Sequence, residues 1–138
     1  MRAVLSGIVL AFILHTTFAI VYAPKIILPN SDSVWTVGHK ELVQWNSTGI
    51  PKGTPGMIMI GYLNPGDINE HLNWTVAKGF DLYESHQSIV VPKDLNPGDN
   101  YIIVLFGDSG NASPTFTIKA DYTRKRRDDR RRVKKSVA

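Results

Sequence analysis

Between residues 24 and 118 the chain consists of short runs of branched and aromatic residues, and turn-forming residues end each run before it grows long. Such runs predict β-strands, and no window shows the apolar stripe of an amphipathic helix. About eight short strands joined by Gly- and Pro-containing turns predict an all-β domain, a two-sheet antiparallel sandwich. The expected strands cover residues 25–28, 33–37, 41–46, 56–63, 74–80, 87–92, 100–106 and 114–118.

The segment LNPGDNYIIVL, residues 95–105, indicates which kind of sandwich this is. A Leu-x-Pro-Gly turn leads into a strand that has Tyr101 near its start and apolar residues on both faces. In immunoglobulin-like folds a tyrosine at this corner bonds its hydroxyl to the backbone upstream. We therefore predict an immunoglobulin- or fibronectin III-like β-sandwich, with this strand at its centre and Tyr101 in a structural role.

The first 19 residues have the basic start, apolar core and small polar exit of a secretory signal peptide. The apolar run is shorter than the roughly 20 residues that a membrane-spanning helix needs. We expect cleavage after Ala19; a cut after Ala23 is the alternative and would leave Pro24 beside the scissile bond. The mature protein is then secreted, with a domain at 24–118 and a tail at 119–138.

The sequence contains no cysteine, although small secreted domains often depend on disulfides. The core must therefore be held by apolar packing, and cysteine nucleophiles and thiolate metal sites are excluded. The three histidines after the signal, His39, His71 and His86, lack the spacing of a metal motif. We expect no metal, no other cofactor and no catalytic residues.

Charge divides the chain into a mildly acidic body and a basic tail. Residues 24–118 hold five lysines against nine carboxylates, a net charge of −4, whereas residues 119–138 hold ten basic and three acidic residues, a net charge of +7. A run so rich in charge cannot bury enough apolar surface to pack, so we expect a disordered basic tail. It lacks the apolar stretch of a GPI signal, and no stable membrane anchor is expected.

Several roles for the tail stay open. RKRR followed by RRRVKK would indicate nucleic-acid binding in a cytosolic protein, but the signal peptide argues against a nucleic-acid partner. Arg126 and Arg127 end a multibasic motif that kexin- or furin-type proteases cut, so they are candidate processing residues. The alternatives are electrostatic retention on wall polyanions and a solvated end with no role.

Three N-glycosylation sequons begin at Asn46, Asn73 and Asn111, and Pro114 weakens the third. Successive strand residues face opposite ways, so an outward Asn46 turns Trp45 into the core. The same argument applies less firmly to Trp74, whose segment is irregular. Trp35 lies on an early strand, where an edge position would expose it, and it is our candidate for stacking on a sugar ring.

The combined pattern resembles the N-terminal domain of the Ser/Thr-rich, GPI-anchored fungal cell-wall proteins, which are related to yeast factors for β-1,6-glucan assembly. The shared features are Val-Trp-x-x-Gly, a strand that ends in Trp-Asn, and a Pro-x-x-Leu-x-x-Gly-x-x-Tyr turn with a closing Phe-Thr-Ile, over residues 24–118. The resemblance implies a secreted, non-catalytic protein of the extracellular cell wall that binds or organises β-glucan. The alternatives are a module that binds a wall protein through an exposed sheet edge, and a small precursor processed at its basic tail. The oligomeric state stays open.

Overall fold

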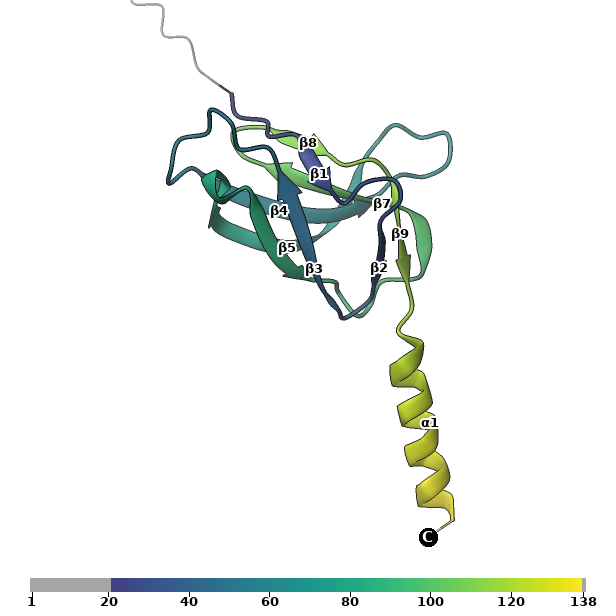
Figure 1. Cartoon of the computed structure of the whole chain (residues 1–138). Coiled ribbons are helices and arrows are strands. Elements are labelled where there is room, and N and C mark those ends of the chain that lie inside the picture. The colour runs from purple at the N-terminus through teal and green to yellow at the C-terminus, as the bar shows by residue number, and fades with distance from the viewer. Residues whose placement is uncertain (1–20, 138) are drawn as a thin grey trace, which may run out of the picture.

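The computed structural model describes residues 21–137, so the predicted signal peptide at 1–19 lies outside the described residues. The strands form two sheets (Figure 1). The smaller sheet has the order β1-β3-β6, formed by β1 (Ile26–Leu28), β3 (Lys40–Trp45) and β6 (His86–Val90). The larger has the order β2-β9-β7-β4-β5, formed by β2 (Val34–Thr36), β9 (Phe116–Lys119), β7 (Gly98–Phe106), β4 (Pro55–Tyr62) and β5 (His71–Asp81). The short β8 (Gly110–Ala112) pairs with β7.

The core lies between the two sheets, where β3 crosses in front of β4 and β5 (Figure 1). Alternate residues of each strand point inward, so the buried side chains of β3 face those of β4 and β7. The core includes Val43, Trp45, Ile58, Ile60, Ile103, Leu105, Phe116 and Ile118, all at most 1% exposed. The indole N–H of Trp45 donates to the backbone oxygen of Leu82 over 2.7 Å in the short 3₁₀-helix η1 (Leu82–Glu84), so the ring is buried without an unpaired donor.

The structure confirms a mostly β, two-sheet, sandwich-like arrangement, and corrects its details. The larger sheet is mixed, because β2 pairs parallel to β9. An antiparallel pairing was expected since neighbouring strands are usually joined by hairpins, but β2 and β9 are distant in sequence and no hairpin fixes their direction. The sequence reasoning also missed β8 and placed the start of β5 three residues late.

The expectation of a disordered tail was wrong, because residues 122–136 form the helix α1 (Tyr122–Ser136). None of its residues is buried, so the argument that this segment cannot pack was sound. Local interactions favour the helix instead. Lys and Arg have good helix propensity, and the side chain of Asp121 caps the first turn by accepting from the N–H groups of Thr123 and Arg124. Asp128 also lies four residues from both Arg124 and Arg132, the spacing at which opposite charges attract.

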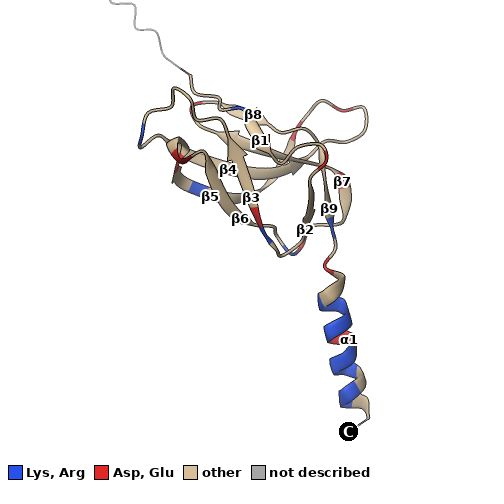
Figure 2. Cartoon of the chain, in the orientation of Figure 1, with Lys and Arg blue, Asp and Glu red and all other residues tan. Residues whose placement is uncertain are grey.

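The helix projects from the end of β9 and stands clear of the sandwich over most of its length (Figure 1). Nine of its 15 residues are Lys or Arg, and its ribbon in Figure 2 is mostly blue, with a red band and tan ends. Within residues 21–137, no helix has the length and apolar character that crossing a bilayer requires.

Candidate functional site

A pocket of about 380 Å³ opens where β4 and β5 meet the segment that leads into β7. Three aromatic side chains contribute to its lining, those of Tyr62, Trp74 and Tyr101. The polar side chains around them are four amides and one carboxylate, from Asn64, Asn73, Asn96, Asn100 and Asp94. A concave surface with aromatic faces and several convergent polar groups is the usual composition of a site for a small polar ligand.

Strand register brings the aromatic residues together. Tyr62, the last residue of β4, lies opposite His71 of β5 and Tyr101 of β7. Its ring stacks on the imidazole of His71, with centroids 4.9 Å apart and planes 14° apart. Trp74 lies opposite Ile60, which directs its indole toward the inner side of the sheet, where it is only partly buried. The pocket is therefore built on regular strands and not on loops alone.

Hydrogen bonds fix two of these aromatic side chains. The Trp74 indole N–H donates to Asp94 Oδ2 over 3.4 Å. The hydroxyl of Tyr101 donates to the backbone oxygen of Asn96 over 2.6 Å, which confirms the predicted tyrosine corner. Burial, with smaller effects from Asp94 and Tyr62, raises the pKa of Tyr101, so its hydroxyl keeps its proton and stays a donor.

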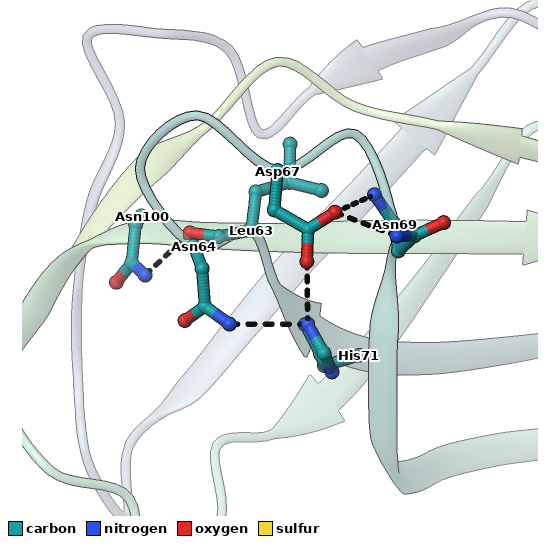
Figure 3. A network of polar contacts seen from close by, with 6 residues as sticks. All are labelled: Leu63, Asn64, Asp67, Asn69, His71 and Asn100. Carbon is teal, nitrogen blue, oxygen red and sulfur yellow. Dashed lines mark hydrogen bonds and ion pairs between the residues drawn. The ribbon is translucent and has the colours of Figure 1, made fainter.

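A polar network holds the loop between β4 and β5 in place beside the pocket (Figure 3). Asp67 Oδ1 accepts from the backbone and side-chain N–H groups of Asn69, over 2.9 and 2.7 Å. These bonds, the backbone one above all, together with the neighbouring His71, lower the pKa of Asp67. On the other side of the loop, the Asn100 amide donates to the backbone oxygen of Leu63 over 2.6 Å. The loop is thus tied to both β5 and β7.

His71 Nε2 lies at the centre of this network, 3.1 Å from Asn64 Nδ2 and 3.4 Å from Asp67 Oδ2. One nitrogen cannot accept from the amide and donate to the carboxylate at once. The neutral ring with its proton on Nδ1 accepts from Asn64, whereas the protonated ring donates to Asp67. The loop therefore has an anchor in either protonation state of the histidine.

The pentapeptide Leu-Asn-Pro-Gly-Asp occurs twice, at 63–67 and 95–99, and both copies border the pocket. The first forms a tight turn in which Asp67 N–H donates to the Asn64 backbone oxygen over 3.0 Å and Gly66 has φ of 78°. A turn with Pro second and a positive-φ residue third requires glycine there. The sequence-based predictions above did not use this repeat, which marks Asn64 and Asn96 as equivalent turn positions.

The prediction that Trp35 is exposed for sugar stacking was wrong. Its side chain is only 5% exposed and packs edge-on against Phe116, with ring centroids 4.7 Å apart. An edge strand exposes its backbone on one side, but its side chains still alternate between the two faces, and Trp35 takes the inner one. Trp45 is buried as predicted, at 1% exposure.

The three sequon asparagines lie in different settings. Asn46 and Asn73 are exposed, whereas Asn111 is partly buried and its side-chain N–H donates to the Pro24 backbone oxygen over 3.0 Å. A glycan at Asn111 would replace one of the two hydrogens on that nitrogen, so only one N–H would remain for the bond to Pro24. Asn73 contributes to the lining of the pocket, so a glycan there would stand at its mouth.

The processing candidates Arg126 and Arg127 lie in the second turn of α1 and are exposed. They are within reach of a protease, but in helical form. Among the residues that the structure describes, no three His, Cys, Asp or Glu side chains gather as a metal site would require. Comparisons with protein-family models, with curated proteins and with solved structures find no match.

Proposed function

We propose that the chain is a secreted, non-catalytic module that binds a neutral cell-wall polysaccharide in the pocket formed by Tyr62, Trp74 and Tyr101. The observation that carries the proposal is the combination of aromatic side chains with amides in one concavity. A sugar ring has an apolar C–H face that packs on an aromatic ring and a rim of hydroxyls that bond to amides. β-Glucan is the ligand class, since the resemblance in the sequence implies it.

The proposal includes an immunoglobulin-like assignment of the sandwich. Its support is the strand order. In that fold the third, sixth and seventh strands form one sheet with the sixth in the middle, and the first, second and fifth belong to the other. The order β9-β7-β4 and the order β1-β3-β6 agree with this scheme when β5 is taken as the extra strand beside β4. The tyrosine corner at Tyr101 is a second feature of the same fold.

Binding of the full mature chain to soluble β-1,6- and β-1,3-glucan tests the proposal. Trp35 and Trp45 are buried, so a change in tryptophan emission on adding glucan would report mainly on Trp74. Trp74→Ala should weaken binding at least about tenfold, equivalent to roughly 1.4 kcal/mol. Tyr83→Ala is the matched control, because Tyr83 is an aromatic residue 49% exposed on η1, outside the pocket, and it should bind like the wild type.

Trp74 also packs against the core, so Trp74→Ala could weaken binding by destabilising the fold. A second, more conservative variant separates the two effects. Trp74→Phe keeps an aromatic ring but loses the N–H that bonds Asp94, and should bind with intermediate affinity. A folded wild-type chain that binds neither glucan, or a Trp74→Ala chain that binds as tightly as the wild type, would refute the proposal.

A protein partner on a free sheet edge is the competing proposal. β5 supports it, because it is the longest strand, 11 residues, and ends the larger sheet. Against it, the pairing of β5 with β4 has three register shifts, and such bulges twist an edge away from further pairing. Crosslinking on intact walls that captures a protein through β5, with no glucan binding in solution, would favour this second function.

A further inference from the structure

A groove of about 610 Å³ lies between the first turns of α1 and the sandwich. Arg124, Arg127 and Arg131 contribute to it from the helix, while His39 and Lys93 contribute from the loops after β2 and β6. The spacing i, i+3, i+7 places the three arginines on one side of the helix, over about 10 Å of its length. Basic side chains of the helix and of the loop after β6, together with the imidazole of His39, thus converge on one concavity, distinct from the pocket described above.

The helix is oriented toward this groove by contacts at its first turn. Asp121 caps the helix and its Oδ2 lies 3.7 Å from His39 Nε2 on the sandwich. The carboxylates of Asp121 and Asp128 lie in the groove as well, so four permanent cations face two anions there. The groove therefore has a net positive charge, and a bound anion would reduce the repulsion among its basic side chains.

We propose that this groove binds the phosphate or sulfate esters of an anionic polysaccharide. Three of its four permanent cations are arginines, whose planar guanidinium bonds two oxygens of a phosphate or sulfate at once. The site goes beyond the neutral-sugar pocket, and it gives the basic tail a specific surface on the domain in place of diffuse attraction.

The composition of the groove and of α1 favours a polysaccharide over other polyanions. A nucleic acid carries a phosphate on each strand about every 3.4 Å, so a strand lying in the groove would meet Asp121 and Asp128 as well as the arginines. The groove also contains no Trp, Tyr or Phe ring, the larger aromatic faces on which bases stack. A membrane surface requires an apolar helix face, and α1 has only Tyr122 and Val133 among its larger apolar residues. A polysaccharide with widely spaced esters can place one ester between the carboxylates.

The test measures binding of the full mature chain to dextran sulfate and to a phosphorylated mannan, with neutral dextran as the blank. The groove variant combines Arg124→Gln, Arg127→Gln and Arg131→Gln. The matched control combines Lys125→Gln, Arg126→Gln and Arg130→Gln, which removes the same charge from positions of the same helix that do not line the groove. The groove variant should bind at least about tenfold more weakly than the wild type, and the control variant within about threefold of it.

Lys93→Gln extends the test to the sandwich side of the groove, and should weaken binding although it leaves α1 intact. Whichever of the two charged polymers binds more tightly identifies phosphate or sulfate as the preferred ester. Equal losses in the groove and control variants would show binding to bulk charge and overturn the proposal. Tighter binding to single-stranded RNA or to vesicles with anionic lipid would overturn it as well. β-Glucan binding should be unchanged in every variant, so failure here is distinguishable from failure of the neutral-sugar pocket.

Discussion

At the scale of single residues, the three tryptophans show what strand alternation determines and what it leaves open. The rule that an outward Asn46 turns Trp45 inward was correct: Trp45, the last residue of β3, is 1% exposed, and Asn46 directly after it is exposed. The exposure expected for Trp35 was inferred from an edge position instead. β2 does end the larger sheet, but Trp35 points to its inner face and is 5% exposed. Trp74 needed the register of β5 against β4, which contains shifts that no local pattern encodes.

Trp45→Phe should destabilise the fold more than its small change in volume implies. The indole N–H bonds the Leu82 backbone oxygen in a buried setting, and its loss leaves that oxygen with only the 3.4 Å bond from Ser85. We expect a loss of about 1–3 kcal/mol in the free energy of unfolding, measured by urea denaturation. Tyr83→Phe, at an exposed aromatic side chain, is the control and should change stability little. Equal stability of both variants would contradict the assignment.

Protonation of Asp81 should lower the free energy of unfolding at low pH. Its carboxylate accepts from the Tyr83 N–H over 3.0 Å and from the Gly53 N–H over 2.8 Å, and these bonds lower its pKa below the ordinary 3.8. A lowered folded pKa means that this stabilisation is complete above the ordinary value and is lost as pH falls through the folded one. The urea concentration at the midpoint of unfolding should therefore decrease as the pH is lowered below about 4.

Asp81→Asn should show a lower midpoint at neutral pH and a shallower fall in acid, because the substituted side chain has no carboxylate to protonate. Asp99→Asn, at an exposed carboxylate of β7, should keep the wild-type profile. A wild-type midpoint that is constant from neutral pH to about pH 2 would exclude this role for Asp81.

At the scale of elements, sequence patterns located nearly all strands because turn residues delimit them, but they missed β8 and α1. β8 has three residues, Gly-Asn-Ala, and none of them favours a strand; only its pairing with β7 makes it one. α1 was missed because the test applied to the tail was burial. Helix propensity and a cap at Asp121 determine its backbone without any buried contact.

Asp121→Ala should reduce the helix content of the tail and leave the unfolding of the sandwich unchanged, because α1 buries none of its residues. The measurement is the far-UV circular dichroism signal at low temperature, compared with a Ser136→Ala control at the other end of the helix. Loss of the cap raises the unfolded population of the tail, and proteolysis follows local unfolding, so a furin-type protease should cut the same variant faster after Arg127. Unchanged helicity together with unchanged cleavage would argue against the capping role of Asp121.

At the scale of the whole molecule, the two candidate sites are neighbours through the segment between β6 and β7. Lys93 contributes to the basic groove and the next residue, Asp94, to the aromatic pocket. The sequence indicated an acidic body and a basic tail, but not their meeting at this segment, because that requires the helix direction after β9 and the path of residues 91–97 together. Neither the direction of the helix nor the path of residues 91–97 can be obtained from charge counts or strand patterns.

Retention of the protein on isolated wall particles should consequently have two components. The groove component is ionic and should disappear as salt is raised to about 0.5 M, where screening acts within a few ångströms. The pocket component depends on stacking and neutral hydrogen bonds and should persist. The amount of the groove triple variant retained on the particles should not depend on salt, and should equal the amount of wild type retained at high salt. Trp74→Ala should lose this salt-resistant retention. A wild-type retention that salt removes completely would contradict this division.

The repeated Leu-Asn-Pro-Gly-Asp turns have a consequence for how such a domain diversifies. Both copies connect strands whose buried side chains hold the fold, yet their own Asn and Pro residues are largely exposed. Exchanges at these exposed Asn and Pro positions can therefore remodel the mouth of the pocket, while the buried Leu95 and the backbone bond from Tyr101 to Asn96 keep the framework beneath in place. Substitution of these side chains, with the length of each connector kept, is a direct route to altered ligand preference on the same scaffold.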